Sequence, residues 1–178
     1  MALRLAVDRP ELIRSVVVYE VPFLSLLDDS PKDDRELPAM GAQLARLRAA
    51  AGRGEGGTAL RGYLDLFGAL EEEWSAMEPT TREAFSENGR CWAEEMGDPE
   101  ATAPPLAELR GVAVPVLALA GGRSPGFAGR IHARLVSELP NATALVLPDG
   151  GHLAPRNEPD LLVGVLGTFL LERNVPST

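Results

Sequence analysis

Three short runs of aliphatic and β-branched residues stand out along the chain. Residues 13–19 read Ile-Arg-Ser-Val-Val-Val-Tyr, residues 114–120 read Val-Pro-Val-Leu-Ala-Leu-Ala, and residues 143–147 read Thr-Ala-Leu-Val-Leu. All three runs have strand character, and the β-branched run 13–19 in particular is typical of a strand that is buried on both faces of a parallel sheet. A proline or glycine soon follows each run and blocks its continuation.

Apolar residues at helical spacing separate these runs. Residues 2–9 have the pattern of a helix end, and a second helix is predicted between the last two strands, ended by Pro140. The final helix is predicted to have Asn157 as its N-cap and Pro159 in its first turn. The helix between the strands has its apolar face at Phe127, Ile131, Leu135 and Leu139, and the final helix at Leu161, Leu162, Val165, Leu166, Phe169 and Leu170. Strands that alternate with helices predict an α/β fold of three parallel strands joined by right-handed crossovers.

Residues 23–109 differ in character, because helical spacing dominates and strand signals vanish. We predict that this segment is a helical cap inserted into a core made of residues 1–22 and 110–178. We expect its apolar residues to pack against each other or against the sheet, and the alternative is that a few line a substrate pocket. These residues are Leu37, Met40, Leu44 and Leu47, then Leu60, Leu64 and Phe67, then Leu70, Trp74 and Met77, and finally Phe85, Trp92 and Met96.

Composition narrows the classes of function. The 178 residues suit one domain, and the net charge of -9 argues against a nucleic-acid or anionic-membrane surface. The single cysteine, Cys91, excludes an intramolecular disulfide and fits a reducing cytoplasm. No apolar run approaches the roughly 20 residues of a membrane span, and no leader sequence is recognisable. With two histidines and no metal-ligand spacing, we expect neither a metal nor a cofactor.

Candidate chemistry gathers where the strands end. In a parallel sheet, reacting groups collect at the carboxyl ends of the strands. Glu20 follows the first strand, the turn 121–124 follows the second, and His152 lies in the loop after the third. A carboxylate beside an imidazole can hold its tautomer and stabilise the imidazolium, which is the acid–base half of a hydrolytic triad.

The order of these motifs resembles the C-terminal portion of the α/β-hydrolase superfamily, including its cap. The resemblance is carried by Val114-Pro-Val-Leu-Ala-Leu-Ala-Gly-Gly, Leu139-Pro-Asn-Ala, Gly150-Gly-His-Leu-Ala and Asn157-Glu-Pro-Asp, together with residues 2–20. It implies that His152 is the catalytic histidine. It also implies a nucleophile elbow, either G-x-S-x-G or a relative with Asp or Cys as the nucleophile, and no serine of this sequence has the G-x-S-x-G context. We expect the elbow to precede Met1.

The resemblance leaves the acid open. Many relatives carry Asp in the turn after the second of these strands, where this sequence has Arg123. Some relatives place the acid after the preceding strand, which favours Glu20 over the residues of the turn 121–125. Asp149 could also orient His152, although its spacing suits a turn residue better. His132 is interpreted as a surface or half-buried helix residue.

Two functions follow from these observations. In the first, the full-length form hydrolyses a small ester, amide or related substrate through a nucleophile, His152 and Glu20, and the cap selects the substrate. In the alternative, the chain is a non-catalytic binding or interaction protein derived from a truncated hydrolase. The strand 13–19 would then expose an edge that invites self-association.

Overall fold

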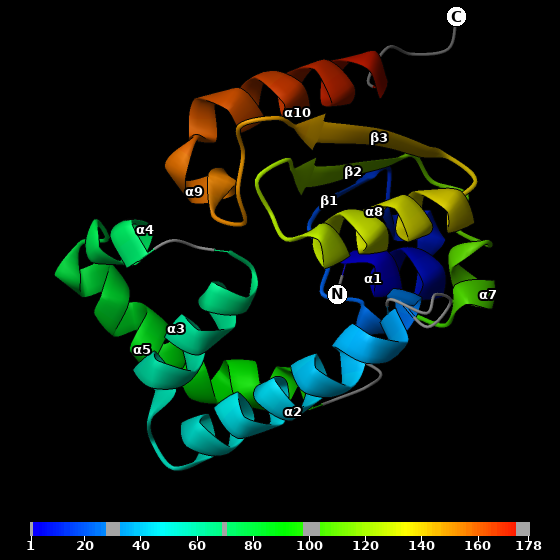
Figure 1. Cartoon of the computed structure of the whole chain (residues 1–178). Coiled ribbons are helices and arrows are strands. Elements are labelled where there is room, and N and C mark those ends of the chain that lie inside the picture. Colours follow the sequence, from blue (N-terminus) through cyan, green and yellow to red (C-terminus); the bar gives the residue numbers. More distant parts are fainter. Residues whose placement is uncertain (1, 28–32, 69–70, 98–103, 174–178) are drawn as a thin grey trace, which may run out of the picture.

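A three-stranded parallel sheet forms the centre of the molecule in the computed structural model, which describes residues 2–27, 33–68, 71–97 and 104–173 (Figure 1). The strands are β1 (Val16–Tyr19), β2 (Val116–Gly121) and β3 (Ala142–Leu147), in the order β1-β2-β3. Val16 pairs with Val116, which pairs with Ala142 on its other side. This arrangement confirms the predicted α/β class with three parallel strands.

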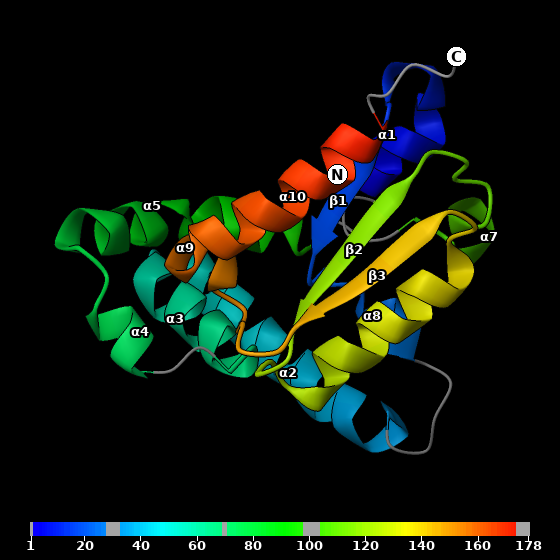
Figure 2. The same cartoon turned by 90° about the horizontal axis from the view of Figure 1, so that it is seen from above.

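Helices cover both faces of the sheet. Helices α1 (Ala2–Asp8) and α8 (Gly126–Glu138) lie on one face, and α10 (Pro159–Arg173) lies on the other (Figures 1 and 2). The arrowheads of the strands point toward the short helix α9 (Ala154–Asn157) and toward the helices of the predicted cap (Figure 2). The remaining elements are η1 (Pro10–Leu12), η2 (Leu24–Leu27), α2 (Asp33–Gly52), α3 (Gly56–Leu66), α4 (Glu71–Ser75), α5 (Pro79–Glu95) and α7 (Leu106–Leu109).

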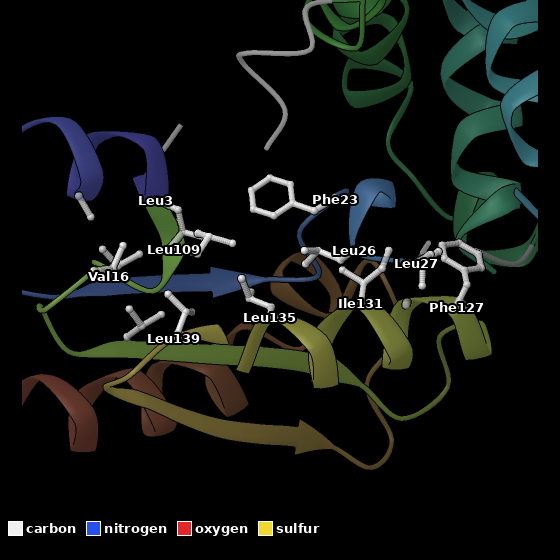
Figure 3. Packing of buried hydrophobic residues seen from close by; sticks show 14 of the residues in the cluster. Leu3, Val16, Phe23, Leu26, Leu27, Leu109, Phe127, Ile131, Leu135 and Leu139 are labelled. Atoms are coloured by element: carbon white, nitrogen blue, oxygen red, sulfur yellow. The ribbon is translucent and has the colours of Figure 1, made fainter. Parts of the chain in front are cut away.

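The main core lies between the sheet and the α1–α8 side. It is built around α8, whose predicted apolar positions Phe127, Ile131, Leu135 and Leu139 are all buried, as Figure 3 shows. Phe23, Leu26 and Leu27 of the segment around η2 also join this cluster, as does Leu109 of α7. A second cluster under α10 contains Leu117, Leu119, Leu147, Leu162 and Phe169.

Several boundaries differ from those predicted. Strand β1 begins at Val16 rather than at residue 13, because Ile13 ends η1 and its N–H donates to the carbonyl of Pro10. The N-cap prediction for Asn157 was wrong, since this residue is the last of α9 and its amide donates to Glu73 Oε1 at 3.1 Å. The prediction for His132 was also wrong: it is buried, and its Nε2 lies 3.1 Å from the carbonyl oxygen of Ala118 in β2.

Helix α10 does not bury its whole predicted stripe. Leu162 and Phe169 are buried, but Leu161 and Leu170 are each 43% exposed and Val163 is 66% exposed. A helix that is apolar on all sides can bury only the face that meets the sheet. Helix α10 therefore presents an apolar outer face.

The helices α2, α3 and α5 pack on one another beside the carboxyl edge of the sheet (Figures 1 and 2). Pro79 opens α5 as predicted, and Met77 is buried just before it. Leu70 lies outside the described residues. The division of the chain into core and cap stays a prediction. None of the described helices is both long and apolar enough to span a membrane.

Candidate active site

The structure brings together the two predicted site residues, Glu20 and His152. Glu20 follows the last residue of β1, and His152 lies in the loop between β3 and α9. His152 Nδ1 lies 2.8 Å from Glu20 Oε2, a hydrogen-bond distance. The Glu20 side chain is fully buried, whereas the His152 side chain is 17% exposed. A buried carboxylate thus holds an imidazole that remains open to a reactant.

The backbone of Glu20 adopts an unusual conformation. Its φ is +45°, the one described non-glycine residue with a positive φ. This left-handed region costs a residue with a Cβ about 1–3 kcal/mol, and such strain clusters at functional sites. The Glu20 N–H still donates to Leu119 at 3.0 Å, so β1 stays attached to β2 while the chain turns.

The Glu20 carboxylate has further donors around it. Its Oε1 accepts a hydrogen bond of 2.8 Å from the Gly121 N–H at the end of β2. The Ser124 hydroxyl, whose oxygen is buried, also favours the charged form of this carboxylate. Burial alone would raise the pKa of Glu20, but His152, Ser124 and Gly121 outweigh it and hold the pKa below its ordinary value. Glu20 is therefore an anion at neutral pH.

This lowered pKa predicts how stability depends on pH. An unfolded Glu20 binds its proton near its ordinary pKa of about 4.3, before the folded protein does. Stability from this group is therefore fully present above that pH and is lost as pH falls through the folded pKa. We expect the free energy of unfolding in urea to decrease across this acidic range. In Glu20→Gln the decrease should be shallower, and an unchanged slope would contradict the lowered pKa.

The loop that carries His152 is tied to β1 and β2. Tyr19 Oη donates a hydrogen bond of 2.5 Å to the carbonyl oxygen of Gly151. The Arg123 N–H donates to the Gly150 carbonyl at 3.0 Å. Burial, reinforced by the Glu20 carboxylate, raises the pKa of Tyr19, so its phenol stays protonated and can donate. Tyr19, which directly precedes Glu20, and Arg123, two residues after Gly121, thus hold the histidine loop in place.

Removing the Tyr19 hydroxyl is expected to have a modest effect. The change Tyr19→Phe leaves the Gly151 carbonyl without its donor, which should lower the free energy of unfolding by about 0.5–1.5 kcal/mol. Urea unfolding measures this loss. Tyr63→Phe is the matched control, because among the described residues nothing hydrogen-bonds to the Tyr63 hydroxyl; equal losses in both variants would count against the Tyr19 bond.

Two aromatic residues of α3 and its C-terminal end lie over His152. The ring centroid of Phe67 is 4.4 Å from that of His152, and that of Tyr63 is 6.3 Å away with its plane at 74°. Within the described parts of the chain, His152 Nε2 has no hydrogen-bond partner. Among the described residues, this second ring nitrogen is therefore left without a polar protein partner.

The other candidates take different positions. Arg123 pairs with Glu158 at 3.5 Å and is more than half exposed, and Asp149 is exposed at the turn. His152 Nδ1 hydrogen-bonds to Glu20 and not to either of them. The described ranges contain no group of three or more His, Cys, Asp or Glu side chains that could hold a metal ion.

Sequence reasoning missed Tyr19, Gly121 and Ser124 as supports of the pair. Position at a strand end could have suggested Gly121 and Ser124, since Gly121 is the last residue of β2 and Ser124 lies in the turn that follows it. Tyr19 carried no such signal, because its side chain is one of the strand's own and its partner lies 132 residues further on.

Comparison with known proteins places the fold. No family model and no curated protein matches the sequence. Solved structures do match. An α/β-hydrolase from Sphaerobacter thermophilus has 21% identity and a TM-score of 0.58, and the matched region covers 95% of this chain and 62% of the hydrolase. The enol-lactonase from Burkholderia xenovorans has 19% identity and a TM-score of 0.63, and the matched region covers 96% of this chain and 61% of the lactonase. The proline iminopeptidase from Mycobacterium smegmatis has 18% identity and a TM-score of 0.61, and the matched region covers 99% of this chain and 63% of the peptidase.

These matches share one pattern of coverage. Nearly all of this chain is matched, and the chain spans about three fifths of the length of each solved structure. The chain therefore has a partial α/β-hydrolase fold.

Proposed function

We propose that this chain is part of an α/β-hydrolase in which Glu20 and His152 form the acid–base half of the active site. The substrate would be a small ester, amide or related molecule. The observation that carries the proposal is the 2.8 Å contact between the buried Glu20 carboxylate and His152 Nδ1, at the carboxyl edge of the sheet. The partial α/β-hydrolase fold supports it.

The chemistry of the pair follows from its geometry. Glu20 accepts a hydrogen bond from the N–H at Nδ1 of His152, which fixes the tautomer with its lone pair on Nε2. Nε2 takes the proton from the hydroxyl of the nucleophile while the hydroxyl oxygen forms a bond to the carbonyl carbon of the substrate. The imidazolium, stabilised by Glu20, then gives that proton to the leaving oxygen or nitrogen as its bond to carbon breaks. A water molecule then attacks the acyl intermediate with the same proton transfers, which releases the carboxylic acid product and restores the nucleophile.

The nucleophile is part of the proposal. No serine of this sequence has the G-x-S-x-G context, so we assign the nucleophile to residues outside these 178. The cytoplasmic location expected from the single cysteine likewise remains a proposal.

The test compares two proteins. One is the 178-residue chain, and the other is the longer product that includes the in-frame sequence encoded before Met1. We expect that added sequence to contain G-x-S-x-G, and only the longer product to hydrolyse p-nitrophenyl esters. A folded longer product that carries this motif yet is inert toward esters and amides, or ester turnover by the shorter chain alone, would contradict the proposal.

A second function, as a non-catalytic interaction module, is favoured by two surfaces. The N–H groups of Val16 and Glu20 both point toward the neighbouring strand, since Val16 donates to Pro115 just before β2 and Glu20 donates to Leu119 within it. By the alternation of a strand, the N–H of Val17 therefore faces the open edge of β1. The outer face of α10 is apolar at Val163, Leu170 and Leu171. An open edge beside exposed apolar residues suits pairing with a second copy of the chain.

Light scattering after gel filtration tests this second function. The 178-residue chain should be a dimer, and Val17→Pro should make it a monomer, because proline removes the outward N–H and leaves the bonds to β2 intact. A monomeric parent chain would exclude self-association, as would a variant that dimerises equally well.

A further inference from the structure

Phe67 connects the helices of the predicted cap to the His152 imidazole. It directly follows α3 and is 4% exposed, inside the main core cluster. Its ring lies 4.4 Å from the His152 ring with 31° between the planes, which is a tilted stacking contact. On its other sides it meets Tyr63 at 4.9 Å and Phe127 of α8 at 5.2 Å.

The backbone holds Phe67 at this point. The Phe67 N–H donates to the Leu64 carbonyl at 3.0 Å, which closes the last turn of α3. Gly68 then has a φ of +74°, and a Cβ at that position would lie 3.3 Å from Pro125 Cδ. The end of α3 is thus pressed against the turn between β2 and α8, and the Phe67 ring fills the space between Phe127 and His152.

A hydrogen bond alone cannot fix the plane of the imidazole. The contact with Glu20 restrains Nδ1, but rotation about the bond between Cβ and Cγ of His152 can still tilt the ring while Nδ1 stays within hydrogen-bond reach of Oε2. A flat partner on the ring face removes this freedom. An aromatic face within about 6 Å also attracts the imidazolium that forms during proton transfer.

We propose that Phe67 is a positioning residue through which α3 sets the plane of the His152 imidazole and stabilises its charged form. The inference rests on the proposed role of His152 as the base. It means that displacing α3 from the core would release the ring and misdirect Nε2, so the cap controls the base as well as the space above it.

The first test uses NMR on the unmodified, isotope-labelled 178-residue chain. Nuclear Overhauser contacts are expected between the ring protons of Phe67 and those of His152. The His152 ring protons should also be shifted upfield by the Phe67 ring current. His132, the other histidine, makes no ring contact within the described parts of the chain and serves as the internal reference. Absence of these contacts in the folded chain would overturn the proposal.

The second test removes the Phe67 ring. In Phe67→Leu, the His152 ring protons should move downfield and its Nδ1 proton signal should broaden, while His132 is unaffected. Phe127→Leu is the matched control, since it deletes a buried ring that also contacts Phe67 and has no ring contact with His152. Unchanged His152 signals in a folded Phe67→Leu chain would overturn the proposal, as would equal changes in both variants.

Phe67→Tyr covers the case in which Phe67→Leu does not fold. It keeps the ring and should keep the upfield shift, and loss of the shift in a folded Phe67→Tyr chain would count against stacking. All these signals come from the chain itself and need no turnover. A longer product that is inert but shows the Phe67 contacts would refute the proposed function, whereas an active product without them would refute only the positioning role.

Discussion

Replacing His152 by alanine is expected to lower ester turnover about 10⁶-fold in the proposed longer, nucleophile-bearing form, and Glu20→Gln about 10⁴-fold. Alanine removes the proton acceptor. Glutamine keeps the size of the Glu20 side chain but cannot stabilise the imidazolium, and its amide can select the wrong tautomer. The effect on Glu20 should be large because its carboxylate is fully buried, 2.8 Å from Nδ1, and supported by the Gly121 N–H.

The matched control for Glu20→Gln is Asp149→Asn. Both changes turn a carboxylate into an amide at a strand end, but Asp149 is exposed and His152 Nδ1 already pairs with Glu20. Asp149→Asn should leave kcat within a few-fold of the parent. A kcat of Glu20→Gln close to that of the parent would exclude Glu20 from the proposed site. A large loss of kcat in Asp149→Asn, with little loss in Glu20→Gln, would favour Asp149 as the acid.

The sequence predicted the frame of the site because the frame depends on simple periodicity. The four-residue spacing from Phe127 to Leu139 describes a helix face that is fully buried, and the three aliphatic runs do form parallel strands. Parallel strands bring their carboxyl ends to one edge, and this alone placed Glu20 near His152 although 132 positions separate them.

The sequence could not predict features that depend on tertiary contacts. The positive φ of Glu20 is imposed by its surroundings, since glutamate has no preference for it. His132 was expected nearer the surface because a helix pattern does not reveal that its Nε2 meets the Ala118 carbonyl, which satisfies a buried imidazole. Asn157 has the chemistry of an N-cap, but α9 ends there and a proline starts α10 two residues later.

Replacing Gly121 by alanine is expected to lower both the stability of the protein and its activity, because Gly121 contacts Glu20 as well as the loop that carries His152. A Cβ at this position would lie 2.5 Å from the Gly150 carbonyl oxygen and 2.9 Å from Tyr19 Oη. The nearest atoms belong to the backbone of the histidine loop, so relief requires that loop to move away from Glu20. Overpacking of this kind costs about 1–3 kcal/mol, sometimes more, and urea unfolding would measure it. The displaced His152 should lower kcat about 100-fold in the nucleophile-bearing form.

Gly151→Ala provides the control, because it adds the same methyl group to the same loop. A Cβ on Gly151 would meet nothing within 4 Å, and this residue has no left-handed φ to strain an alanine. Its stability and kcat should therefore stay close to those of the parent. If Gly121→Ala were equally harmless, the histidine loop would be free to shift without consequence, and the close approach of β2 to Gly150 could not be what holds His152 against Glu20. If only Gly121→Ala is damaged, the absence of a side chain at this strand end is a requirement of the site.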